Sequence, residues 1–163
     1  MSTAPTNWLS DAEQRAWRAW LVADRLLFER LDRDLQHDAG MSLADFEILV
    51  RVSEAPDRQL RMSELACETL FSRSRLSHAV DRLEALGWLF RCGCPTDRRG
   101  TFAGLTDAGR AALEIAARRH VAAVRGYVFD GLKPDEVAQL EHLATVIRSR
   151  IGPTEDGRPR RSC

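Results

Sequence analysis

Apolar residues recur at helical spacing from the start of the chain. In "SDAE", Ser10 and Glu13 form a capping box, in which each side chain accepts a backbone N–H of the other residue. This box predicts a first helix that ends near Gly40 and runs for about thirty residues, longer than a small domain needs. Its apolar positions are Trp17, Trp20, Leu21, Leu27, Phe28, Leu31 and Leu35. Long terminal helices of this kind often pack against a second subunit.

Three shorter helices are predicted next. Ser42 caps the first of them, which ends at "EAPD" because Pro56 disfavours helical angles in the residue before it. Another covers about residues 62–70. The last begins after Ser72 and ends at Gly87, where a helix C-terminus requires left-handed backbone angles. Its apolar face consists of Leu76, Val80, Leu83 and Leu86.

A β-hairpin follows this helix. The strands "WLFR" (88–91) and "TFAGL" (101–105) flank the loop "CGCPTDRRG", whose turn-forming residues include two arginines at the tip. Thr106 then caps a helix that runs to about Phe129, and a final helix opens with Pro134 at its first position.

This order of elements predicts a mainly α-helical fold with a small β-hairpin wing, the winged helix-turn-helix arrangement. The second helix of such a pair enters the major groove of DNA, and the arginines of the hairpin reach the narrow minor groove beside it. The segment "SRSRLSHAVDRLEALG" (72–87) places serine hydroxyls, guanidinium groups and an imidazole on the face opposite the apolar one. A solvated helix face is the alternative interpretation of these residues.

The charge distribution favours the DNA-binding interpretation. The formal net charge is +0, but residues 1–50 carry five arginines and nine acidic residues, whereas residues 72–101 carry six arginines and three acidic residues. A basic segment in a neutral chain is typical of a nucleic-acid contact surface.

Three segments resemble the MarR family of bacterial transcriptional regulators. They are "MSELACETLFSRSRLSHAVDRLEALGWLFR", "PTDRRGTFAGLTDAGR" and "LKPDEVAQLEHLATVI". The similarity covers about residues 10–150, and its most specific part pairs the 72–87 helix with a wing that reads "DRRG…LT…G". Leu70 departs from the family pattern, which often has glycine in this turn, and Lys133 stands where many relatives have a capping Ser or Thr.

The resemblance implies a homodimer that binds a pseudo-palindromic site in double-stranded DNA. The winged helix-turn-helix region would span residues 41–105, and the dimerisation helices 10–40 and 106–152. Residues 1–9 and 153–163 are expected to be a disordered N-terminus and a flexible tail.

The resemblance also implies which residues contact DNA. The recognition-helix positions are Ser72, Arg73, Ser74, Arg75, Ser77 and His78, with Arg82 at the later, phosphate-contacting edge. On the wing, Asp97 braces the loop and Arg99 enters the minor groove, with Arg98 as the second candidate there.

Family members are usually repressors that are released by a small aromatic or anionic effector. The effector binds between the dimerisation helices and the winged region. The aromatic residues that could line such a pocket here are Trp17, Trp20, Phe28 and Phe46. The same aromatic residues could instead belong to the core or to the dimer interface.

Cysteine chemistry gives an alternative hypothesis, a regulator switched by thiol oxidation. Cys92 and Cys94 lie near arginines that can lower a thiol pKa, while Cys67 and Cys163 are isolated. The C-x-C spacing is not that of a redox or zinc motif, so inert thiols and no metal are expected. A winged-helix module that binds protein is a further alternative.

No catalytic grouping stands out, so neither enzymatic activity nor a cofactor is expected. His37, His120 and His142 each occur singly on helices. The polar start "MSTAPTN" lacks the features of a signal peptide, and no apolar run reaches the length of a membrane span. A cytoplasmic protein is expected.

Overall fold

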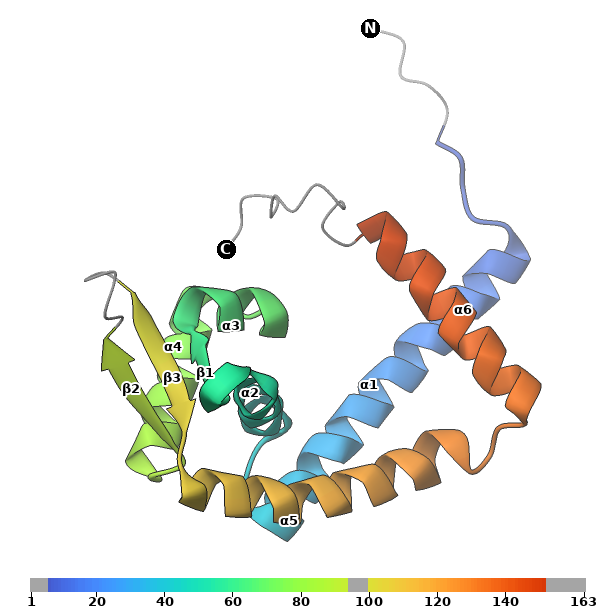
Figure 1. The fold of residues 1–163 in the computed structure, drawn as a ribbon. Coiled ribbons are helices and arrows are strands. Elements are labelled where there is room, and N and C mark those ends of the chain that lie inside the picture. Colours follow the sequence, from blue (N-terminus) through green and yellow to red (C-terminus); the bar gives the residue numbers. More distant parts are fainter. Residues whose placement is uncertain (1–5, 94–99, 152–163) are drawn as a thin grey trace, which may run out of the picture.

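The computed structural model describes residues 6–93 and 100–151. A compact head of short helices and strands lies at one end. Two longer helices extend from it, and a third follows at the far end of one of them (Figure 1). The long helices are α1 (Asp11–Ala39), α5 (Asp107–Val124) and α6 (Pro134–Ile151). Helices α1 and α5 pack against each other, so the chain enters the head from one of them and leaves it through the other.

The helix starts follow from local capping, as the sequence predicts. Ser10 N–H donates to the Glu13 carboxylate over 2.7 Å, and Ser42 forms the same capping box with Asp45. Thr106 Oγ1 accepts the Gly109 N–H over 2.9 Å at the start of α5. These side chains satisfy backbone N–H groups that a helix leaves without partners in its first turn.

The head contains α2 (Leu43–Glu54), α3 (Met62–Thr69) and α4 (Arg73–Ala85), packed against a small antiparallel sheet. Its hydrophobic core is formed by buried side chains from α2, α3, α4 and the sheet, among them Ile48, Leu49, Val52, Leu65, Leu76, Val80, Leu83 and Leu89. The mainly helical winged helix-turn-helix arrangement is therefore confirmed.

The sheet has three strands rather than the predicted two. The hairpin strands β2 (Leu89–Gly93) and β3 (Thr101–Leu105) pair as expected, but β1 (Gln59–Arg61) pairs with the other edge of β3. A short 3₁₀ turn, Pro56–Arg58, leads into β1. The strand was missed because three residues are too few to show the alternation that predicts a strand.

Two short helices end in left-handed backbone conformations. Gly87, after α4, has a φ of 72°, as predicted. Leu70, after α3, has a φ of 56°. Leucine therefore adopts the left-handed conformation that glycine adopts most easily in such a turn.

A π-helical turn, Arg125–Phe129, continues directly from the end of α5. It is closed by a hydrogen bond of 2.8 Å from Asp130 N–H to the Arg125 carbonyl. Helix α6 then begins without a Ser or Thr cap. In its place Glu136 accepts the Lys133 N–H over 2.8 Å, which satisfies one of the exposed amides. None of the 18 residues of α6, all of which the structure describes, is buried.

Candidate nucleic-acid interface

Helix α4 presents most of the predicted contact residues on one exposed face. Ser72 caps it, accepting the Arg75 N–H over 3.3 Å. The predicted α4 residues that are exposed are Ser72, Arg73, Ser74, Arg75, His78 and Arg82, while Ser77 is half-buried. Leu76, Ala79, Val80 and Leu83 anchor the opposite face in the core. Core packing therefore fixes which side chains of α4 point outward.

Arg91 on β2 holds α4 against the sheet. Its guanidinium lies 2.7 Å from the Asp81 carboxylate and 2.5 Å from the Glu84 carboxylate, and it donates to the Ser77 carbonyl over 3.2 Å. Only 23% of its side chain is exposed. Part of the positive charge of residues 72–101 is thus paired with carboxylates of the head.

Arg82 has an intramolecular partner as well. It forms an ion pair with Asp45 at the start of α2, where the Asp45 side chain is only 6% exposed and the Arg82 side chain 52%. Asp45 also accepts the Ser42 hydroxyl over 2.7 Å. The contact joins the two helices, so Arg82 has a structural role in addition to the predicted one.

Arg75 is oriented by an aromatic ring. Its guanidinium carbon lies 4.0 Å from the centroid of the Phe71 ring, within the range of a cation–π contact. Phe71 is itself half-buried against the core. This stacking restricts the arginine side chain before it meets any partner.

A concave surface of about 450 Å³ lies between the start of α3, α4 and the base of the wing. Its lining residues are Arg61, Met62, Ser63, Arg73, Leu76, Ser77, Arg91, Gly100 and Thr101. Arg61 lies over the Phe102 ring at 5.4 Å. Arg61 was missed from the sequence because its strand was not predicted, although the two arginines of "RQLRMSELA" just before a helix could have indicated it.

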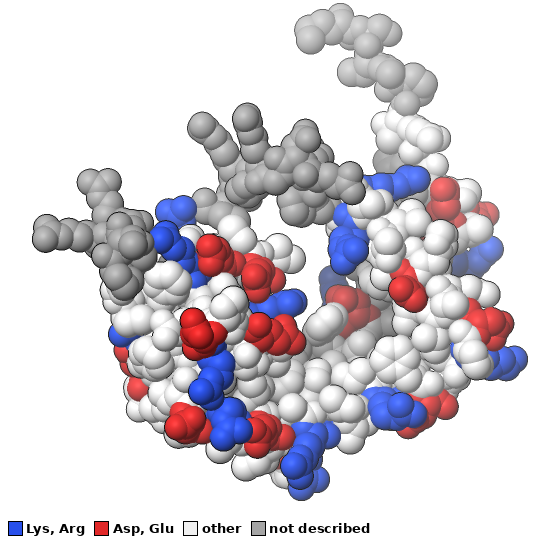
Figure 2. All heavy atoms as spheres, viewed as in Figure 1, with Lys and Arg blue, Asp and Glu red and all other residues white. Residues whose placement is uncertain are grey.

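Acidic side chains are mixed with basic ones over much of the face seen in Figure 2, and basic side chains also lie beside the base of the wing. The three predicted wing residues, Asp97, Arg98 and Arg99, lie outside the described residues. Cys94 and Cys163 also lie outside them.

The four predicted pocket residues are not gathered at one place. Phe46 is buried in the head, where its ring lies 4.6 Å from that of His120, whereas Trp17, Trp20 and Phe28 are exposed on α1. The assignment of these residues to an effector pocket stays a prediction.

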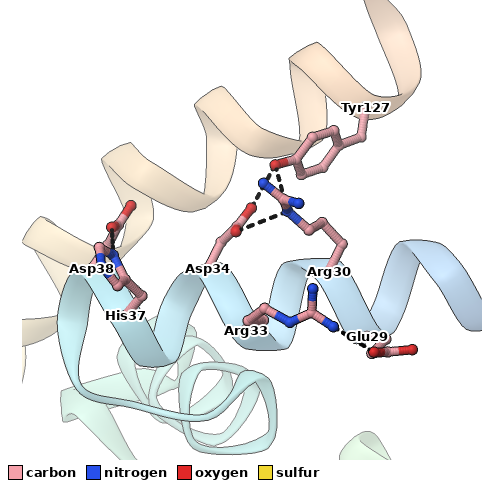
Figure 3. Close-up of polar contacts among 7 residues, drawn as sticks. All are labelled: Glu29, Arg30, Arg33, Asp34, His37, Asp38 and Tyr127. Atoms are coloured by element: carbon pink, nitrogen blue, oxygen red, sulfur yellow. Dashed lines mark hydrogen bonds and ion pairs between the residues drawn. The ribbon is translucent and has the colours of Figure 1, made fainter.

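A pocket of about 310 Å³ does lie between α1 and α5. It is lined by Leu31, Asp34, Leu35, Asp38, Arg119, His120, Ala122, Ala123 and Tyr127. Burial lowers the pKa of His120, whose Nδ1 has no hydrogen-bond partner among the described residues. At the pocket rim, Tyr127 meets Arg30 and Asp34 (Figure 3). Sequence reasoning missed this site, since its polar groups come from positions far apart in the chain.

The described thiols show no metal site. Cys92 is half-buried on β2 and donates to the Gln59 Oε1 over 3.5 Å, while Cys67 is exposed on α3. Within residues 6–93 and 100–151, no three His, Cys, Asp or Glu side chains group as metal ligands. The thiol-switch hypothesis stays a prediction.

Comparison with known proteins identifies the family. The sequence model of the MarR family matches residues 39–100. The HTH-type transcriptional regulator MhqR of Bacillus subtilis is 30% identical over 116 residues, which are 71% of this chain and 75% of that protein. The chain belongs to the MarR family of transcriptional regulators.

Solved structures of MarR family regulators from Streptomyces coelicolor are more similar still. Sco3205, whose crystal structure is in complex with DNA, is 45% identical with a TM-score of 0.89, over 94% of this chain and 97% of that one. AbsC is 42% identical with a TM-score of 0.84, over 89% and 97% of the two chains. The MarR regulators similar to this chain are thus transcriptional regulators rather than enzymes. None of the helices in the described part of the chain combines the length and the apolar character that crossing a membrane requires.

Proposed function

We propose that this MarR regulator is a homodimeric, sequence-specific repressor that reads DNA with α4 and is released by a small-molecule effector. The observation that carries this proposal is the exposed face of α4, where Arg73 and Arg75 lie in the first turn above a helix face fixed in the core. The 45% identical Sco3205 was solved in complex with DNA, which supports the same use of the fold here.

The first turn of α4 enters the major groove. Arginine matches the two acceptors of guanine, and the Ser72, Ser74 and Ser77 hydroxyls bond bases or phosphates. Arg82 keeps its pairing with Asp45 and turns its solvent-exposed side to a phosphate. Asp97, Arg98 and Arg99 serve the wing contact in the minor groove.

The long helices form the dimer. Large apolar side chains are exposed on all three of them, including Trp17, Trp20, Phe28, Ile115, Val121, Leu143, Ile147 and Ile151. Helix α6, in which no residue is fully buried within its own chain, is the strongest support, because an amphipathic helix requires a partner for its apolar stripe. Residues 10–40 and 106–152 are thus the dimerisation helices, and residues 41–105 form the DNA-reading head.

The effector binds in the pocket between α1 and α5. Leu31, Leu35 and Ala123 supply an apolar floor for a small aromatic molecule, and Arg119 supplies a positive charge for an anionic group. A ligand at this position contacts both helices that connect to the head, so its binding can change the orientation of the two heads of the dimer relative to each other.

Selection of DNA fragments by the purified full-length protein, followed by fluorescence anisotropy on the selected operator, tests the proposal. Arg75→Ala should weaken operator binding by about 1–3 kcal/mol and relax base preference. Arg110→Ala, which removes an exposed arginine on α5 paired with Glu114, is the matched control and should bind like the parent.

The salt dependence separates DNA binding from a protein-binding module. Release of counterions from phosphates makes DNA affinity fall steeply as salt rises. An operator affinity that does not change with salt concentration would contradict DNA binding through phosphate contacts. If the Arg73→Ala and Arg75→Ala variants bind operator and random DNA like the parent, α4 is not the DNA-reading surface.

A further inference from the structure

The end of α5 carries a local change in helix geometry. Residues Arg125–Phe129 form a π-turn, which inserts one extra residue into the helical repeat. Such bulges are rare and are often found at functional sites. In this turn stands Tyr127, the single tyrosine of the sequence.

The Tyr127 hydroxyl lies between two groups of α1 (Figure 3). It donates to Asp34 Oδ2 over 2.6 Å and accepts from Arg30 Nε over 3.1 Å. The same Arg30 N–H is shared with Asp34 Oδ1 at 3.0 Å, which closes a ring of three polar groups. A hydroxyl suits this position, because it can donate to a carboxylate, which only accepts, and accept from a guanidinium, which only donates.

We propose that Tyr127 is a positioning residue for DNA binding, whose hydroxyl fixes the angle between α1 and α5 and thereby the separation of the two DNA-reading heads. This inference rests on the dimeric DNA-binding function proposed above. Helices α1 and α5 are the two connections to the head, and Tyr127, just past the end of α5, joins them seven residues beyond His120, whose ring packs against Phe46 of the head.

The distance from Tyr127 to the start of α5 is long enough for a small rotation to affect DNA recognition. The 20 residue steps from the start of α5 at Asp107 to Tyr127 span about 30 Å. Over that length, a rotation of about 6° at the contact moves the start of α5, which lies within the head, by about 3 Å, close to the rise of one base-pair step, about 3.4 Å. The contact is exposed, so its contribution to the free energy of unfolding is small, and the main effect expected of its loss is on geometry.

The spacing of the operator half-sites is therefore the quantity to measure. The full-length parent and Tyr127→Phe are titrated by fluorescence anisotropy with the selected operator and with versions whose half-sites are one base pair closer or farther apart. The parent should bind the altered operators at least ten-fold more weakly than the native one. Tyr127→Phe should reduce this discrimination about three- to ten-fold, with unchanged affinity for random DNA.

Arg125→Ala is the matched control. It removes another surface contact of the same π-turn, the 3.0 Å pair of Arg125 with Asp130, which is more exposed and does not reach α1. It should keep the parent's discrimination. Asp34→Asn breaks the same ring from the α1 side and should reproduce the effect of Tyr127→Phe, with no further change in the double variant.

A spectroscopic readout follows from the single tyrosine. Protein labelled with 3-fluorotyrosine gives one ¹⁹F signal, which should shift in Asp34→Asn and stay in place in Arg125→Ala. If Tyr127→Phe and Asp34→Asn keep the parent's spacing preference, the inference is overturned while the proposed function stands. A parent that binds DNA without any spacing preference would contradict both.

Discussion

Arg82 on α4 and Asp45 on α2 form an ion pair that joins these two helices of the head. The Asp45 carboxylate also caps α2 by accepting the Ser42 N–H and hydroxyl. One buried carboxylate therefore both caps the start of α2 and holds α4, so the orientation of α4 is tied to the stability of the head.

Asp45→Ala should lower the free energy of unfolding by about 1–3 kcal/mol, because it removes a cap and leaves the Ser42 donors without their partner. Arg82→Ala should cost less, since the carboxylate keeps both bonds from Ser42. Urea unfolding followed by circular dichroism measures both. Glu54→Ala, at the exposed end of α2, should stay within about 0.5 kcal/mol of the parent. An equal loss in Glu54→Ala and Asp45→Ala would mean that the ion pair has no special role.

Phe71→Leu should weaken operator binding about two- to five-fold, the effect of an exposed cation–π contact of about 0.5–1 kcal/mol. The substitution keeps the apolar packing of the half-buried ring but removes the aromatic face on which Arg75 rests. Anisotropy titrations at several salt concentrations should show an unchanged salt slope, because no charge is lost. In the Arg75→Ala background the same change should have no effect, and a full additional loss there would contradict the stacking role.

Leu70→Gly should raise the free energy of unfolding by about 1 kcal/mol, because a left-handed conformation costs an L-residue about 1–2 kcal/mol that glycine does not lose. Leu70 has a φ of 56° and is 86% exposed, so little packing is lost. Leu86→Gly is the control, at a helix end with a φ of −77° and a side chain 51% exposed. It should destabilise the protein in the same urea titration, and stabilisation by both changes would point to a cause other than backbone angle.

The contribution of Asp34 to stability should disappear in acid. The hydrogen bond from Tyr127 lowers the pKa of Asp34, and the nearby guanidinium groups of Arg30 and Arg33 lower it further. A carboxyl whose pKa is lower in the folded chain stabilises that chain above its unfolded pKa, about 3.9, and loses this effect as the pH falls through the folded pKa. Urea titrations of the parent and Asp34→Asn should differ at pH 7, and the difference should shrink below about pH 4 and vanish once the pH is under the lowered folded pKa of Asp34. A difference that persists in acid would contradict this role for the ionised carboxylate.

The sequence was sufficient to predict the elements that depend on neighbouring residues. The caps at Ser10, Ser42, Ser72 and Thr106, together with the left-handed Gly87, set the helix limits, and the structure confirms them. The face of α4 followed from its apolar spacing for the same reason. Strand β1 could not be predicted because its three residues depend on pairing with β3.

The partners of individual charged residues could not be predicted from the sequence. Arg82 meets a residue 37 positions away, and Tyr127 meets one 93 positions away, so neither partner is indicated by local spacing. The arginine-rich composition of the 72–101 segment therefore overstated the positive charge that faces outward. The arginine content of this segment indicates DNA binding only in combination with the helix and hairpin pattern.

If α6 forms the dimer proposed above, the stability of the protein depends on its concentration. The apolar stripe of α6 is at most half-buried within one chain, so the partner would supply contacts that offset the entropy cost of ordering those 18 residues. Association and folding of this segment are then one equilibrium, and the melting temperature should rise with protein concentration. At low concentration the proposed dimer would dissociate, and α6 would lose these contacts.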